Sequence, residues 1–200
     1  MSTAFPDTGP QEETIRTIGN AELLFKRGVK ILRFNKARWG SDDDGFKYGY
    51  LAPYLYGRVL HLGVGLGLSL DAILDSGDVT EILAYEWEQD IADIYTEEHS
   101  SDPRLTIEVA DAHTNKPSGT FDLCLYELMT NNEIEYLKTK EYLQWIWQRM
   151  NSGGYLILPA DRFSRALMGE FPQLSWSEVG VKDAARPTIR PLPIWIVVQK

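Results

Sequence analysis

The sequence contains a single cysteine, Cys124, inside the apolar run FDLCLY. One cysteine excludes an internal disulfide and a zinc site built from cysteines, and its apolar setting predicts a buried, inert thiol. The three histidines show no metal-binding spacing such as His-Glu-x-x-His, so we expect no metal. The Gly-x-Ser-x-Gly nucleophile motif and the phosphate-binding Gly-x-x-x-x-Gly-Lys motif are also missing, which argues against a hydrolase or a P-loop enzyme.

Long hydrophobic runs and basic residues are both scarce. No window reaches the ~20 uncharged apolar residues of a membrane span, and the N-terminal stretch MSTAFPDTGPQEET does not read as a signal peptide. We therefore expect a cytoplasmic protein with no membrane partner. Twenty Lys and Arg residues against 29 Asp and Glu residues give a formal charge of −9. Because nucleic-acid affinity depends on neutralising phosphates, we expect no nucleic-acid partner.

The 200 residues, 44% of them hydrophobic, are enough for one sizeable core. Residues 1–20 have no apolar periodicity and are interpreted as a mobile or loosely packed arm. In residues 21–57, the runs AELLF and VKILRF predict a small N-terminal hairpin, which a helix follows. Residues 58–200 are predicted to form a single α/β domain.

In that domain, apolar strands alternate with helical stretches. Strands are predicted at 58–62, 79–86, 104–110, 121–128 and 153–159, and helices at 68–76, 88–99 and 133–150. This alternation predicts a mostly parallel, twisted sheet with helices on both faces. The last helix has an apolar stripe that includes Leu137 and Tyr142, and 151–154 is predicted to end it. Segments 171–181 and 191–200 are predicted to complete the sheet as an antiparallel strand pair.

Three glycines, Gly63, Gly65 and Gly67, lie between a predicted strand and a predicted helix. Glycine lets the backbone turn sharply and approach a ligand closely, and the first amides of the helix can donate hydrogen bonds to it. A plain strand-to-helix turn is the alternative, and the glycines alone do not decide between the two.

Acidic residues end the next two predicted strands. Glu86 follows the glycines by about twenty residues, where a carboxylate can accept hydrogen bonds from both ribose hydroxyls of a nucleoside. Glu88 is a less well-placed rival, and either acid could instead favour a helix start. Asp111 follows the third strand. Because open α/β sheets bind ligands at the carboxyl ends of their strands, the three signals together predict a nucleoside site.

These stretches carry a family resemblance. VLHLGVGLGLS, ILAYEWE, DPRLTIEVADAH and FDLCLYE resemble the core of class I S-adenosylmethionine-dependent methyltransferases, and more closely their spermidine synthase-like branch. DGFKYGYL extends the likeness upstream through Asp44, Phe46 and Tyr48, so that it covers about residues 21–158. The resemblance implies a Rossmann-like methyltransferase fold that binds S-adenosylmethionine, with Glu86 on the ribose and Asp111 near the adenine amine. It also adds Tyr48 to the cofactor site.

The resemblance places Glu127 where the synthases carry a catalytic Asp, which implies that it accepts a proton from, or orients, an acceptor amine. In two places the sequence departs from the synthases: Leu66 replaces an Asp of the glycine turn, and Gly49 and Tyr50 replace residues that shape the amine site. We therefore expect methyl transfer to an unidentified small acceptor. Aminopropyl transfer from decarboxylated S-adenosylmethionine and a noncatalytic nucleoside-binding protein remain alternatives.

His61 lies in the strand just before the glycines. It is interpreted as a satisfied core or cleft histidine, with contact to the helix amides or to the methionine part of the cofactor as the alternative. Besides the small-molecule acceptor, a second copy of the chain is left open as a partner in a homodimer.

Overall fold

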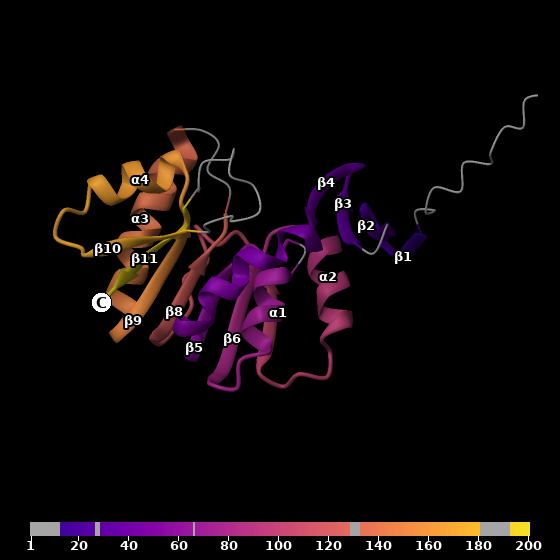
Figure 1. Ribbon diagram of the computed structural model, residues 1–200, viewed down its shortest axis with the longest axis horizontal. Helices are drawn as coiled ribbons and strands as arrows, with labels where there is room; N and C mark the ends of the chain where they lie inside the picture. The colour runs from indigo at the N-terminus through magenta and orange to yellow at the C-terminus, as the bar shows by residue number, and fades with distance from the viewer. Residues whose placement is uncertain (1–12, 27–28, 66, 129–132, 181–192) are drawn as a thin grey trace, which may run out of the picture.

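The computed structural model describes residues 13–26, 29–65, 67–128, 133–180 and 193–200. Their strands form two sheets, one of four strands in the order β1-β2-β3-β4 and one of seven in the order β10-β11-β9-β8-β5-β6-β7 (Figure 1). None of the helices in these ranges is long and apolar enough to cross a membrane.

The smaller sheet is antiparallel and consists of β1 (Glu13–Ile18), β2 (Ala21–Lys26), β3 (Val29–Phe34) and β4 (Ala37–Ser41). Its β2-β3 pair confirms the predicted hairpin. Residues 13–18, assigned from the sequence to a loosely packed arm, instead pair with β2. Their β-branched threonines and isoleucines suit an edge strand, which needs few apolar contacts because main-chain hydrogen bonds hold it. A 3₁₀ helix, η1 (Asp42–Tyr54), connects the two sheets.

The larger sheet confirms the predicted α/β fold. Its parallel strands are β5 (Gly57–Leu62), β6 (Val79–Glu86), β7 (Leu105–Val109), β8 (Phe121–Tyr126) and β9 (Met150–Pro159). The antiparallel C-terminal pair is β10 (Trp176–Gly180) and β11 (Pro193–Gln199), with β11 next to β9. The helices are α1 (Leu68–Leu74), α2 (Gln89–Glu98), α3 (Glu133–Arg149) and α4 (Arg162–Gly169).

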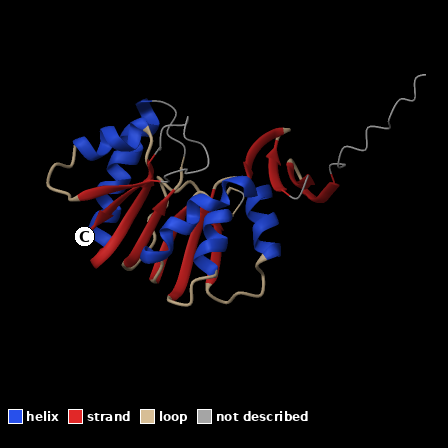
Figure 2. Cartoon of the chain, in the orientation of Figure 1, coloured by secondary structure: helices blue, strands red, loops and turns tan. Residues whose placement is uncertain are grey.

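Helices cover both faces of the larger sheet (Figure 2). Leu60 of β5 belongs to the core beneath α3 and α4, together with Tyr142. Val59, its neighbour, belongs to the core beneath η1 and α1, together with Leu70. The alternation of side chains along a strand thus sends successive residues of β5 into different cores. Cys124 is fully buried, as predicted, and burial raises the pKa of its thiol.

Three features of the C-terminal third differ from what the sequence predicts. Helix α4 was not predicted. It is short, and its N-cap is Asp161, whose carboxylate accepts the main-chain N–H of Ser164 at 2.7 Å. Helix α3 ends at Arg149, just before the predicted stop, but β9 begins at Met150 rather than at residue 153. Within β9, a Cβ on Gly154 would be 2.8 Å from the main-chain oxygen of Asp122. Leu137 is 54% exposed rather than part of the packed stripe of α3.

The smaller sheet packs against α2. Apolar residues on β2 and β3, including Leu23 and Leu32, form a cluster with Ile91 and Ile94 of α2. The Asp90 carboxylate accepts the main-chain N–H of Asn20, in the turn between β1 and β2, at 2.7 Å. The smaller sheet is therefore attached to the larger one through a helix whose other side packs on β6 and β7.

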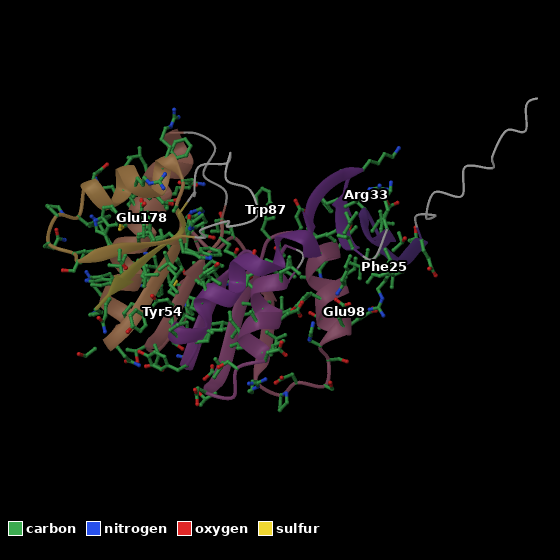
Figure 3. The ribbon with its side chains drawn as sticks, viewed as in Figure 1. Phe25, Arg33, Tyr54, Trp87, Glu98 and Glu178 are labelled. Carbon is green, nitrogen blue, oxygen red and sulfur yellow. The ribbon has the colours of Figure 1, made fainter. Side chains whose placement is uncertain are left out.

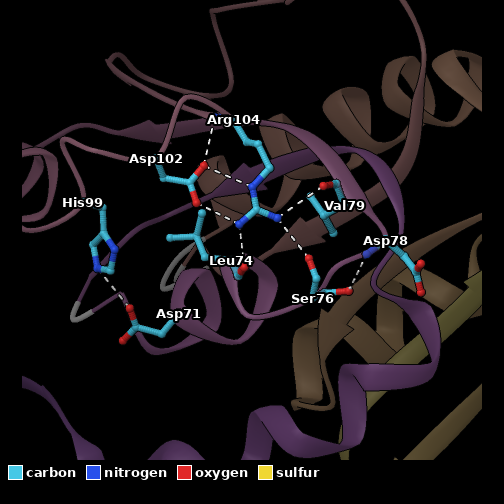
Figure 4. A network of polar contacts seen from close by, with 8 residues as sticks. All are labelled: Asp71, Leu74, Ser76, Asp78, Val79, His99, Asp102 and Arg104. Atoms are coloured by element: carbon cyan, nitrogen blue, oxygen red, sulfur yellow. Dashed lines mark hydrogen bonds and ion pairs between the residues drawn. The ribbon is translucent and has the colours of Figure 1, made fainter.

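Arg104, which the sequence places in an Asp-Pro-Arg motif, lies directly before the outer strand β7 and connects it to the end of α1 (Figure 4). Its guanidinium donates to the main-chain oxygens of Leu74 at 2.6 Å, Ser76 at 3.0 Å and Val79 at 3.3 Å. Asp102 accepts from two of its nitrogens, at 3.0 and 2.7 Å, and these hydrogen bonds lower the pKa of Asp102 to about 2. One side chain therefore satisfies the last carbonyl of α1, one in the turn that follows it and the first carbonyl of β6.

We expect Arg104→Met to lower the free energy of unfolding by about 1–3 kcal/mol, because it leaves three carbonyls and a carboxylate without their donor. Arg165→Met is the matched control, since Arg165 makes a surface ion pair with Glu178 and its loss costs under ~1 kcal/mol. Urea unfolding of both variants measures the difference. Equal losses would show that the Arg104 network contributes no more than a surface pair.

Candidate functional site

The residues singled out from the sequence follow the carboxyl ends of β5, β6, β7 and β8. These strand ends lie along one border of the larger sheet, which we call its carboxyl edge. The chain runs from β5 out to β6 and β7, and then returns to β8 on the other side of β5. Ligands of open α/β sheets bind at the carboxyl ends of the strands beside such a reversal. Gly63, Glu86, Asp111 and Glu127 each come at or just after the end of one of these four strands, so the topology brings them to the same edge.

The glycine turn lies between the ends of β6 and β8. The Gly63 N–H donates to Tyr85 O at 2.9 Å, and the Glu127 N–H donates to Leu62 O at the same distance. All three glycines have positive φ angles: 91° at Gly63, 53° at Gly65 and 80° at Gly67. The turn needs glycine for its backbone conformation whether or not it holds a ligand.

Two of these glycines have opposite surroundings. A Cβ on Gly67 would lie 1.6 Å from the Tyr95 ring, whereas a Cβ on Gly65 meets no atom within 4 Å among the described residues. The Tyr95 hydroxyl donates at 2.9 Å to Gly67 O and lies 2.6 Å from the Asp71 carboxylate. Burial, with Asp71 beside it, raises the pKa of Tyr95. Gly67 is therefore a packing glycine, while Gly65 lies against open space.

Glu86 binds the turn directly and is only 5% exposed. One carboxylate oxygen accepts the N–H groups of Val64 at 2.9 Å and Gly65 at 3.1 Å. The other accepts the N–H groups of Trp87 at 3.0 Å and Glu88 at 3.1 Å. Because a carboxylate has about four lone-pair positions, these donors occupy its full accepting capacity. Through these hydrogen bonds, Glu86 holds the glycine turn in place.

Asp111 lies at the same edge but is more open. Its side chain is 39% exposed, and one oxygen accepts the His113 N–H at 2.9 Å and lies 3.4 Å from the His113 Nδ1 atom. The N–H groups of Thr114 and Asn115 donate to Asp111 O, so the residue also starts the turn that leads away from β7.

Glu127 is the centre of a polar chain that joins four elements. Its Oε1 atom accepts from the Tyr48 hydroxyl at 3.0 Å, which brings together two residues that are 79 positions apart. Its Oε2 atom lies 3.2 Å from Nε2 of His61. The same nitrogen lies 2.7 Å from the Ser69 hydroxyl of α1. Glu127 is 16% exposed and His61 is fully buried, so the chain runs from the sheet edge into the interior.

Sequence reasoning missed two residues here. No sequence pattern marks Ser69 as a site residue, because its role depends on the fold that brings it to His61. Trp87 could have been found from the sequence, since it is a large aromatic residue directly after an acid at a strand end. It is 68% exposed and stands out from the ribbon above the sheet in Figure 3. Leu66 lies outside the described residues, and Gly49 and Tyr50 are exposed.

Comparison with known proteins supports the fold. No protein-family model and no curated protein matches the chain. An rRNA methylase from Streptococcus thermophilus matches with a TM-score of 0.58 at 13% identity, over 78% of this chain and 94% of that one. N-methyltransferase NodS from Bradyrhizobium japonicum, in complex with S-adenosyl-l-homocysteine, matches with a TM-score of 0.58 at 9% identity, over 78% and 84%.

Spermidine synthase from Thermotoga maritima matches with a TM-score of 0.64 at 16% identity, over 93% of this chain and 72% of that one. A match of that extent includes part of the smaller sheet. The chain thus has the fold of class I S-adenosylmethionine-dependent methyltransferases, with spermidine synthase-like structural relatives, as the sequence resemblance predicted.

The two glycines give a test of this geometry. We expect Gly65→Ala to cost about 1–2 kcal/mol of folding free energy, because only its backbone conformation is unfavourable. Gly67→Ala should cost about 1–3 kcal/mol more, because its Cβ also collides with the Tyr95 ring. Urea unfolding compares the variants, and equal costs would contradict the packing role of Gly67.

Proposed function

We propose that this protein is an S-adenosylmethionine-dependent transferase that moves a methyl group to a small-molecule acceptor. The observation that carries the proposal is the meeting of the glycine turn, Glu86, Asp111 and Glu127 at the carboxyl edge, beside the reversal between β5 and β8. The formal charge of −9 favours a small acceptor over a nucleic acid.

The residues at this edge fit an adenosyl group. The open space at Gly65 leaves room for a ligand to approach the backbone, and the exposed Trp87 ring offers a flat surface for a base. Asp111 has an exposed carboxylate that can accept from an exocyclic amine. Since Glu86 already accepts four N–H groups, it must exchange two of them for the ribose hydroxyls. We therefore expect the turn to change its hydrogen bonds when the ligand binds.

Bound S-adenosylmethionine supplies an electrophilic methyl carbon next to its sulfonium. The chain's own contribution is positioning, which can provide several kcal/mol of a transfer barrier. Glu127 would accept the proton that the acceptor loses, or orient the acceptor, with Tyr48 fixing one carboxylate oxygen.

Aminopropyl transfer is the second candidate. Two observations favour it: the spermidine synthase match extends into the smaller sheet, and Tyr48 and Glu127, which the resemblance matches to two separate synthase motifs, contact each other. The replacement of an acid by Leu66 in the glycine turn favours methyl transfer instead.

Calorimetric titration with S-adenosylhomocysteine tests the cofactor site. We expect the wild-type chain to bind it, and Glu86→Gln to weaken binding by about 1–3 kcal/mol, because Gln has one accepting oxygen instead of two. Glu88→Gln is the matched control two residues away and should leave the affinity unchanged. No binding to the wild-type chain, or equal affinities for both variants, would rule out this site.

Comparison of donors separates the candidate functions. Thermal stabilisation by S-adenosylmethionine above that by its decarboxylated form supports methyl transfer, because a ligand stabilises the folded state according to its affinity. Stronger stabilisation by the decarboxylated form together with putrescine supports aminopropyl transfer. Binding without transfer to any amine, acid or hydroxyl acceptor points to a noncatalytic nucleoside-binding protein.

A further inference from the structure

His61 is an unusual residue for its position. It lies near the carboxyl end of β5, between Leu60 and Leu62, and is fully buried. Apolar residues fill such positions in parallel strands, and a polar side chain is costly there unless it has partners. Its Nε2 atom has two, the Ser69 hydroxyl at 2.7 Å and the Glu127 carboxylate at 3.2 Å. Its Nδ1 atom is buried and has no hydrogen-bond partner among the described residues.

These contacts determine where the imidazole carries its hydrogen. An ionised carboxylate can only accept, so the nitrogen that faces Glu127 must donate. A hydrogen on Nδ1 would instead leave a buried donor unpaired and set the Nε2 lone pair against the carboxylate. The arrangement therefore favours a hydrogen on Nε2, shared between Glu127 and Ser69, and a bare Nδ1.

We propose that His61 is a positioning residue for Glu127, and that the acceptor in this site is a small molecule that loses an N–H or O–H proton when it is alkylated. The proposal rests on the transferase function proposed above. His61 holds Oε2 and Tyr48 holds Oε1, so both oxygens of the carboxylate are fixed from elements other than its own. A carboxylate oriented in this way suits proton acceptance, which an acceptor without a hydrogen on the attacking atom does not need.

The transfer balances as follows. The acceptor N or O atom forms a bond to the carbon next to the sulfonium, and the carbon–sulfur bond breaks with its electron pair going to sulfur. The acceptor's proton moves to the Glu127 carboxylate. His61 takes no part in the bond changes and keeps its Nε2 hydrogen throughout.

Nitrogen-15 NMR of the histidine rings tests the hydrogen bond without any acceptor. We expect His61 to carry its hydrogen on Nε2, and we expect that resonance to move in Glu127→Gln, because the carboxylate is its partner. His113→Gln is the control, since His113 bonds to Tyr126 and Thr139 outside this chain of contacts and should leave the His61 signals in place. A hydrogen on Nδ1, or a resonance that Glu127→Gln does not move, overturns the proposal.

Two substitutions at His61 separate positioning from a structural role. His61→Leu removes the donor and fills the site with apolar atoms, so the denaturation midpoint should stay the same or rise. His61→Gln keeps an N–H that can reach Glu127. With tritiated methyl donor and a panel of small amines, phenols and carboxylic acids, we expect kcat to fall about tenfold to a hundredfold in the Leu variant and to recover in the Gln variant, with the donor KM unchanged.

A lower midpoint in His61→Leu without a loss of kcat, or a Gln variant as slow as the Leu variant, shows a structural role and overturns the proposal. Its failure can be told apart from failure of the transferase function. If S-adenosylhomocysteine does not bind the wild-type chain, the function fails, while NMR still reports the His61 hydrogen bond. If it binds and His61 carries its hydrogen on Nδ1, only the positioning proposal fails.

Discussion

The hydrogen bonds of Glu86 to the main chain are the constraint on which the candidate site depends. A turn with three positive φ angles cannot pair its N–H groups within a regular helix or strand, so its shape depends on the acceptors that these groups meet. Glu86 accepts two of these donors and also binds the first two N–H groups after β6. One carboxylate thus fixes the turn after β5 relative to the start of α2. The charge that would recognise a ribose is the same charge that shapes the site.

In the proposed function, this double use would make ligand binding an exchange of partners. A ribose that donates to Glu86 must displace main-chain N–H groups, and these groups need new acceptors because unpaired buried donors are costly. A ligand with oxygen atoms near the turn can supply them. The affinity for an adenosyl compound is then a difference between two sets of hydrogen bonds, so the part of the ligand beyond the ribose affects how readily Glu86 is released.

Much of the larger sheet could be predicted from the sequence because its strands are short apolar runs between helical stretches, and the predicted bounds of β6 are the observed ones. Prediction was wrong where main-chain contacts decide the structure. Residues 13–18 lack apolar periodicity, yet they form the strand β1 through main-chain pairing with β2. In the site, the positions of Glu86 and Glu127 follow from strand ends. Their partners do not, because main-chain donors and residues distant in sequence leave no local pattern.

The polar chain through Glu127 explains why the segment before the larger sheet matters for the site. Tyr48 comes from η1, which also contributes Leu51 to the core beneath α1. The packing of η1 on that face therefore sets the position of the Tyr48 hydroxyl, and the hydroxyl holds Glu127. His61 reaches the same carboxylate from β5. Tyr48 of η1 and His61 of β5 hold the Glu127 carboxylate at the end of β8. Glu127 is therefore oriented only when the larger sheet and the segment before it are assembled together.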